Sequence, residues 1–139
     1  MGRGGPQAGG FGRLPSLTLA NALVAARAAS AKTLETTVVL DVGDLIGITD
    51  YFIITAGRNE RQVRSIVDEV GKRLRELAGL SVLQTEGLEG SHWVLLDYGD
   101  FVVHVFDTEA RSLYSLERLW ADAPRVAVDD TVPANVAGN

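Results

Sequence analysis

The 139-residue sequence contains no cysteine, so it can hold neither a disulfide framework nor a thiolate metal site. No apolar run approaches the roughly 20 residues that span a bilayer. The first sixteen residues also lack the apolar core of a secretory signal. These absences predict a cytoplasmic protein with no membrane partner, and no motif in the sequence calls for a metal or a cofactor.

Runs of basic residues are missing as well. The net charge is −5, and residues 17–120 hold 15 acidic and 10 basic side chains. Nucleic-acid-binding proteins usually neutralise phosphates with clusters of Lys and Arg. The acidic balance therefore argues against RNA or DNA as the main ligand and favours a basic protein partner, although many enzymes are acidic too.

Composition divides the chain into three parts. Residues 1–16 are rich in glycine and predict a disordered extension. Residues 17–122 alternate apolar segments with turns and are enough for one domain with a core. Residues 123–139 are rich in Pro, Ala and Asp without periodicity, which predicts a flexible C-terminal tail.

The hydrophobic periodicity predicts the element order α-β-β-α-β-β-β-α. The expected helices cover residues 17–32, 60–78 and 109–120, and the expected strands cover 37–42, 51–56, 81–84 and the two arms of a hairpin within 91–107. Asn59 and Gln62 are spaced as a capping box for the second helix. The order predicts an α/β (α+β) fold with a mixed sheet of about five strands and helices packed mainly on one face.

The hairpin carries an unusual second face. With Gly99-Asp100 as a two-residue turn, one side of the pleat is apolar and belongs to the core. The other side then holds the pairs Trp93 with Phe106, Leu95 with His104, and Asp97 with Val102. An aromatic cluster rimmed by polar groups is typical of a binding surface, although each residue alone is more typical of a core and a helix could cover the face instead.

Catalytic chemistry has little support in the sequence. Asp97 and His104 could form one pair, but a metal site needs three or four converging ligands. No nucleophile has an obvious base partner, and no phosphate-binding loop is present. Nucleotidyltransferases place two carboxylates, one residue apart, after a Gly-Ser pair. Here Gly90-Ser91 precedes Asp100, but the second carboxylate position is Val102.

Several blocks of the sequence, taken in order, resemble the ribosomal silencing factor family, also called the Iojap-like family. They are residues 50–54, Arg61-Gln62-Val63, Glu86-Gly87, residues 93–100, His104-Val105-Phe106, Arg111 with Tyr114, and residues 116–120. Each block alone could be core or turn, but the set in this order and spacing is specific. The resemblance covers about residues 17–122.

The resemblance implies a nucleotidyltransferase-like fold that has lost catalysis, in agreement with Val102. It implies a protein that binds the large ribosomal subunit through ribosomal protein uL14, sterically blocks association with the small subunit, and represses translation under nutrient limitation. A nearby contact with ribosomal RNA and a homodimer stay open as further partners. The alternative is a degenerate nucleotide-binding protein or enzyme on the same fold.

On this basis the hairpin is the expected partner-binding surface. Trp93 would insert as an apolar anchor with Phe106 beside it, and His104 would orient Asp97 or donate a hydrogen bond. The predicted partner-binding residues are Glu89, Trp93, Asp97, Tyr98, Asp100, His104 and Phe106, with the carboxylates facing basic groups of the partner. Pairing of two copies through the same aromatic surface is a competing interpretation.

Overall fold

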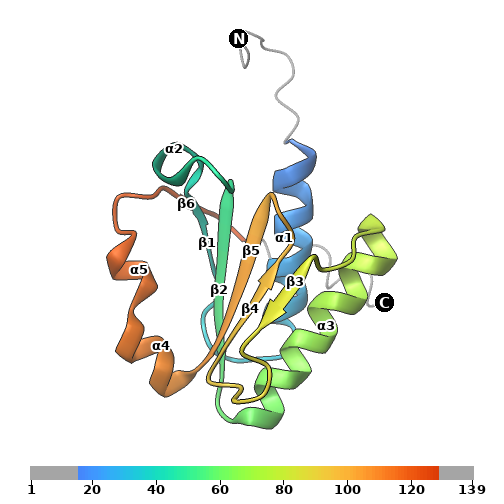
Figure 1. The fold of residues 1–139 in the computed structure, drawn as a ribbon, viewed down its shortest axis with the longest axis vertical. Coiled ribbons are helices and arrows are strands. Elements are labelled where there is room, and N and C mark those ends of the chain that lie inside the picture. Colours follow the sequence, from blue (N-terminus) through green and yellow to red (C-terminus); the bar gives the residue numbers. More distant parts are fainter. Residues whose placement is uncertain (1–15, 129–139) are drawn as a thin grey trace, which may run out of the picture.

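In a computed structural model, which describes residues 16–128, the alternating apolar segments form one sheet with helices on both faces (Figure 1). The helices are α1 (Leu17–Ser30), α2 (Gly43–Ile46), α3 (Glu60–Ala78), α4 (Thr108–Tyr114) and α5 (Leu116–Leu119). The strands are β1 (Val38–Asp41), β2 (Tyr51–Gly57), β3 (Gln84–Glu86), β4 (Trp93–Asp97), β5 (Phe101–Asp107) and β6 (Arg125–Val126).

The strands form one mixed sheet in the order β3-β4-β5-β2-β1-β6. Strands β2 and β5 pair in parallel at the centre, and the other neighbours are antiparallel. A parallel pair needs a crossover connection, which here contains α3 and the β3–β4 arm. The predicted mixed α/β sheet is confirmed, with six strands where about five were expected.

The predicted register of the hairpin is also confirmed. Trp93 pairs with Phe106, Leu95 with His104, and Asp97 with Val102. The turn is closed by the Tyr98 N–H, which donates to the Phe101 carbonyl at 3.0 Å. Gly99 takes a positive φ of 88°, as expected for glycine in a two-residue hairpin turn.

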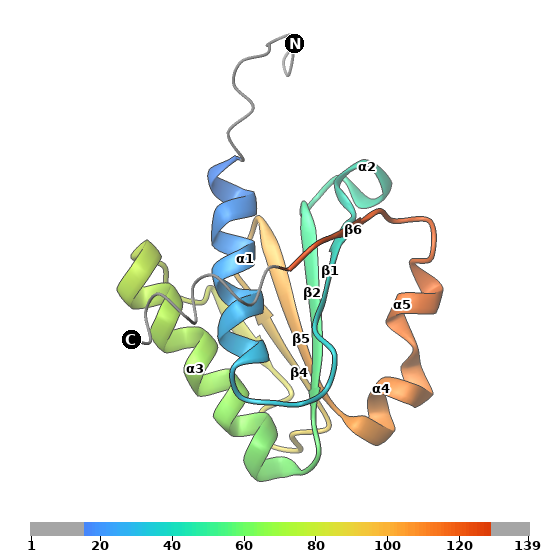
Figure 2. The ribbon, with the colours of Figure 1, turned by 180° about the vertical axis from the view of Figure 1, so that it is seen from behind.

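The two long helices share one face of the sheet (Figure 2). Helix α3 starts as its sequence predicts: the Asn59 side chain accepts the Gln62 N–H at 2.8 Å, while the Gln62 side chain accepts the Arg58 N–H. Its apolar stripe packs against the sheet. The fully buried side chains of helix α1 are all small, and they let it lie close to α3; they are Ala22, Ala25, Ala26, Ala28 and Ala29.

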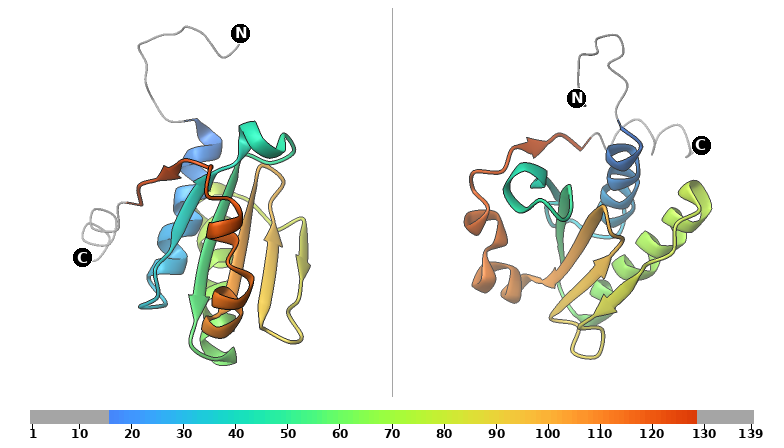
Figure 3. Two further views of the ribbon diagram at one scale, coloured as in Figure 1. Left: turned by 90° about the vertical axis from the view of Figure 1, so that its left-hand side faces the viewer. Right: turned by 45° about the horizontal axis from the view of Figure 1, so that its top comes forward.

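The other face is covered only in part, by α4 and α5 (Figure 3). The prediction of one continuous helix over residues 109–120 is wrong. Ser115 has a φ of 47° and ends α4, and its hydroxyl donates to the Ser112 carbonyl. The guanidinium of Arg111 holds the two short helices together by donating to the Glu117 carboxylate at 2.8 Å.

The first residues after Asp122 do not form the predicted tail. Ala123 is buried, and Arg125–Val126 pairs with β1 as strand β6. The Pro124 carbonyl accepts the Asp41 N–H at 2.8 Å. A two-residue strand shows no periodicity, so only its pairing with a distant strand reveals it. Residues 1–15 and 129–139, where the extension and the rest of the tail were predicted, lie outside the described residues.

Two glycines with positive φ allow a test of backbone packing. A Cβ on Gly87 (φ 83°) would lie 2.1 Å from the Trp93 carbonyl oxygen, whereas a Cβ on Gly79 (φ 67°) meets no described heavy atom within 4 Å. We expect Gly79→Ala to lower the free energy of unfolding by about 1 kcal/mol, the cost of the left-handed conformation. Gly87→Ala adds a steric clash and should cost at least about 2 kcal/mol more. Urea unfolding measures both, and equal losses would contradict the close approach of Gly87 to β4.

Candidate partner-binding face

Six rings gather on the side of the sheet that carries α4 and α5. This surface is called the aromatic face below, and it consists of Phe52, Trp93, His104, Phe106, Tyr114 and Trp120. The Trp93 ring lies 4.9 Å from Phe106 and 4.8 Å from Tyr114, measured between centroids. The rings come from β2, β4, β5, α4 and the residue after α5, so the face exists only in the folded chain.

The aromatic face has a buried floor and an accessible upper layer. Phe106 is 0 % exposed and His104 is 5 % exposed. Trp93 is half-buried, and Tyr114 is 51 % exposed. The expectation that Phe106 lies beside Trp93 is confirmed, but the expectation that Phe106 is available to a partner is wrong, because α4 and the Trp93 ring cover it.

His104 positions Trp93 and not Asp97. The Trp93 Nε1–H donates to His104 Nδ1 at 3.1 Å. An accepting Nδ1 places the ring proton on Nε2, which is buried and has no hydrogen-bond partner among the described residues. Burial lowers the pKa of His104 to about 4, so the imidazole is neutral at pH 7. Asp97 instead accepts the Gly99 N–H at 2.8 Å and fixes the hairpin turn.

Tyr98 lies on the opposite side of the sheet from the aromatic face. Its ring stacks on Phe101 with centroids 5.2 Å apart and packs on the core under α1 and α3. The prediction that Tyr98 belongs to one partner-binding surface with Trp93 therefore does not fit the structure. Burial raises the pKa of the Tyr98 hydroxyl, and Arg75 acts against that rise.

The three predicted carboxylates do not form one rim. Asp97 and Asp100 lie at the hairpin turn, whereas Glu89 precedes β4 at its other end. The loop of Glu89 is tied to α3, because Arg64 donates to the Leu88 carbonyl at 2.9 Å. The structure thus brings Asp97 and Asp100 together and separates Glu89 from both.

Three rings of the aromatic face are not among the partner-binding residues predicted from the sequence. Phe52 contacts His104 edge-on at 4.7 Å and Trp120 at 5.8 Å, and Tyr114 covers Trp93. The even-numbered residues of β2 share one face, so Phe52 was detectable from its alternation once the pairing with β5 is known. Next to this face, α2 and the turn after it present two more apolar side chains, Leu45 and the 85 % exposed Ile48.

The described residues contain no group of three or more His, Asp and Glu side chains that could hold a metal ion. Asp100 lies in the hairpin turn, and Val102 occupies the place of a second carboxylate on β5. The aromatic face offers surfaces for hydrophobic contact and hydrogen bonding. None of the helices in the described part of the chain combines the length and the apolar character that a bilayer-spanning helix requires.

The buried imidazole makes a prediction about acid stability. The pKa of His104 is about 4 in the folded protein and about 6.5 when unfolded, so between these values only the unfolded chain binds the proton. The free energy of unfolding must then fall as the pH falls. We expect His104 to account for a loss of about 2 kcal/mol between pH 7 and pH 5. Urea unfolding of wild type and His104→Gln at pH 7 and pH 5 measures this loss. The His104→Gln variant has no imidazole at this position, so its free energy of unfolding should fall less between the two pH values.

His92→Gln is the matched control, since the chain has only these two histidines. In the wild type, the hydrogen bond between His92 and Asp107 raises the pKa of His92. His92 therefore stabilises the fold at low pH, and this effect is lost as the pH rises. His92→Gln should therefore keep the acid loss or deepen it. Identical pH dependence in wild type and His104→Gln would show that His104 is not buried in its neutral form.

Comparison with known proteins identifies the family. The family described as "Ribosomal silencing factor during starvation" matches residues 15–139. The ribosomal silencing factor of Bacillus subtilis is 41 % identical over 106 residues, which cover 76 % of this chain and 89 % of that protein. The mouse protein named "Mitochondrial assembly of ribosomal large subunit protein 1" is 32 % identical over 84 residues, or 59 % of this chain and 37 % of that one.

The fold agrees with a solved relative. A crystal structure of protein CV0518 from Chromobacterium violaceum superposes with a TM-score of 0.72 at 31 % identity, covering 85 % of this chain and 98 % of that one. Sequence and structure lead to the same assignment: the chain belongs to the ribosomal silencing factor family.

Proposed function

We propose that the protein binds the large ribosomal subunit through ribosomal protein uL14, using the aromatic face, and that the bound protein sterically blocks the small subunit. The observation that carries this proposal is the Trp93–Tyr114 ring pair, with centroids 4.8 Å apart. Trp93 is held by His104 and half-buried, while Tyr114 is exposed beside it. A preorganised aromatic pair of this kind is a typical anchor of a protein interface.

The charge of the chain outside the helix layer supports a basic protein partner. Residues 37–57 and 81–128 carry eleven acidic and only three basic side chains. Asp97 and Asp100 lie at one end of the hairpin, next to the sheet surface that α4 and α5 leave open. Carboxylates placed around an apolar anchor speed association with a basic surface and add less to affinity than the anchor does.

Membership of the family supports the ribosomal target and the regulatory role. The family description refers to ribosomal silencing during starvation, and the mouse relative's name refers to assembly of the large ribosomal subunit. The chain accordingly acts by occupying a surface and not as an enzyme. The proposal places it in the cytoplasm, where it represses translation when nutrients are limiting, and a second copy of the chain competes for the same face.

Co-sedimentation with purified large subunits tests the proposed face. We expect Trp93→Ala to weaken binding by about 2 kcal/mol, or roughly thirtyfold in dissociation constant, as for a central aromatic anchor. Because Trp93 also contacts the buried Phe106, circular dichroism must show that the Trp93→Ala variant is folded. Tyr114→Ala removes an exposed ring from the same pair with little cost to the core, and it should weaken binding in the same direction.

Leu34→Ala is the control, because Leu34 is an exposed apolar residue in the turn between α1 and β1, outside the aromatic face. It should bind as wild type does. If folded Trp93→Ala and Tyr114→Ala pellet with large subunits as wild type does, the contact lies elsewhere on the protein. If wild type itself stays in the supernatant, large-subunit binding fails.

Blocking of subunit joining is tested separately. Large subunits preincubated with a saturating amount of the protein should form fewer complete ribosomes when small subunits are added, because both compete for one surface. Light scattering measures the joining, and Tyr114→Ala at the same concentration should block less. Full joining in the presence of bound wild-type protein would mean that the protein binds away from the subunit interface.

A further inference from the structure

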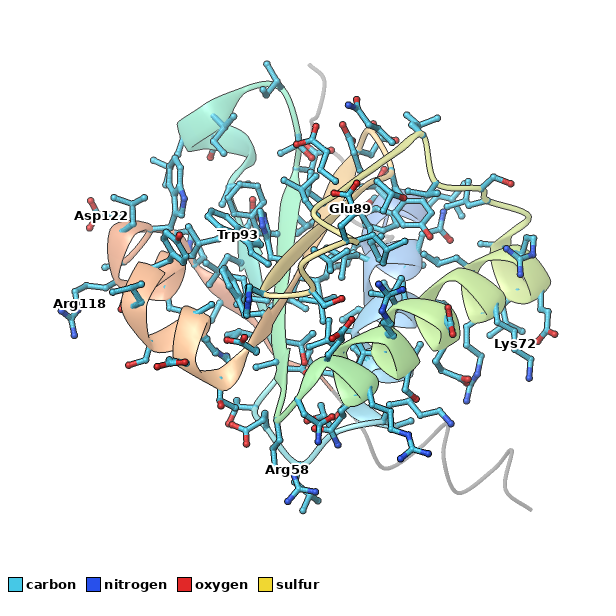
Figure 4. All side chains as sticks on the ribbon, turned by 60° about the horizontal axis from the view of Figure 1, so that its bottom comes forward. Arg58, Lys72, Glu89, Trp93, Arg118 and Asp122 are labelled. Atoms are coloured by element: carbon cyan, nitrogen blue, oxygen red, sulfur yellow. The ribbon has the colours of Figure 1, made fainter. Side chains whose placement is uncertain are left out.

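A second charged surface lies on the helix layer, on the other side of the sheet from the aromatic face. Residues 17–36 and 58–80, which form α1, α3 and the turns beside them, carry eight basic and five acidic side chains. The remaining described residues carry three basic and eleven acidic ones. Lys72 on α3 and Trp93 on β4 extend on opposite sides of the sheet (Figure 4). The helix layer is thus basic, although the rest of the described chain and the whole chain are acidic.

The basic charge follows one stripe of α3. Arg61, Lys72 and Arg75 are exposed, and positions eleven and three residues apart return to the same side of a helix. None of the ion pairs found between residues 16 and 128 involves any of the three. At a rise of about 1.5 Å per residue, Arg61 and Arg75 are about 21 Å apart along the helix. We refer to these three residues as the α3 stripe.

Two shallow hollows flank the α3 stripe, and Lys72 lines both. The first, of about 390 Å³, lies beside Arg61 and Lys32. The second, of about 430 Å³, lies between α3 and the sheet and is lined by Arg75 and Tyr98. One carboxylate, Asp68, also lines both hollows, and it takes part in none of the ion pairs of the described residues. A second exposed carboxylate, Glu76, lies one helical turn after Lys72.

We propose that the α3 stripe contacts the phosphate backbone of helical RNA. Side chains without an ion-pair partner can bind phosphate oxygens: Lys does so as a compact positive charge, and Arg does so with the several N–H donors of its planar guanidinium group. Arg61, Lys72 and Arg75 are spread along a helix and are not grouped in one pocket, which suits a polymer of phosphates better than a single small anion. Contacts of this type fix orientation and carry no base sequence.

The α3 stripe gives the protein a second kind of partner beside a basic protein. The aromatic face, with Asp97 and Asp100 at the neighbouring hairpin turn, would meet a basic ribosomal protein. The basic helix layer on the other side of the sheet would meet nearby RNA. This inference rests on the proposed function only for the source of the RNA, which is the large subunit. The contact itself depends on the charge and spacing of the helix residues and can be measured without ribosomes.

The test measures binding of the full chain to a short, fluorescently labelled RNA duplex by anisotropy at several salt concentrations. We expect the double change Lys72→Gln/Arg75→Gln to lower the slope of log affinity against log salt by about 2, since each lost phosphate contact removes about 0.9. The control, Arg118→Gln/Arg125→Gln, removes the same charge from exposed residues on α5 and β6 and should leave the slope unchanged. Melting curves check that every variant is folded. The single variants Arg61→Gln, in the stripe, and Arg118→Gln, its control, repeat the comparison with one charge removed instead of two.

The outcomes separate this inference from the proposed function. Equal slopes for the two double variants would show a response to net charge only and overturn the α3 stripe. No duplex binding by wild type at low salt, together with binding to large subunits, would also overturn the stripe and leave the proposed function standing. Duplex binding that depends on the stripe, without binding to large subunits, would keep the stripe and refute the proposed function. Stripe-dependent binding of polyglutamate but not of the duplex would assign the surface to an acidic protein and overturn the RNA contact.

Discussion

The parallel pairing of β2 with β5 is the constraint on which the rest of the structure depends. It joins the two halves of the chain at the centre of the sheet through seven aligned residue pairs. The register sets Phe52 beside Val102 and Ile54 beside His104. Because side chains alternate with a period of two, a slip of one residue would turn these side chains toward the helix layer. The aromatic face and the core under α1 and α3 are therefore fixed by the same set of backbone hydrogen bonds.

The sheet set up by this pairing divides the molecule chemically as well as structurally. One side carries the aromatic face, and the other carries the long helices with most of the basic residues. Most of the carboxylates lie outside the helix layer. The net charge of −5 hides this separation, because it averages two surfaces of opposite character. A large ribosomal subunit offers basic protein and RNA phosphate together, so a small protein with two oppositely charged faces could engage both.

The aromatic face depends on a costly arrangement below its surface. His104 is buried, and one of its nitrogens has no hydrogen-bond partner within residues 16–128, which opposes folding because that nitrogen has lost its hydrogen bond to water. Its other nitrogen accepts the indole N–H of Trp93 and fixes the ring in place. A ring that is already ordered loses less conformational entropy on binding. Burial of His104 thus lowers the stability of the folded protein, while its hydrogen bond orders the Trp93 ring before a partner binds.

Local patterns in the sequence determined the family, the hairpin register and the capped helix α3, because each depends on neighbours within a few residues or on a turn that fixes pairing. Tertiary structure alone decided which side chains are accessible. It buried Phe106, turned Tyr98 toward α3, broke the last helix at Ser115, and placed Arg125–Val126 in the sheet. Alternation tells which residues share a face, but the covering of that face depends on segments far apart in the chain, and their packing leaves no periodic signal in the sequence.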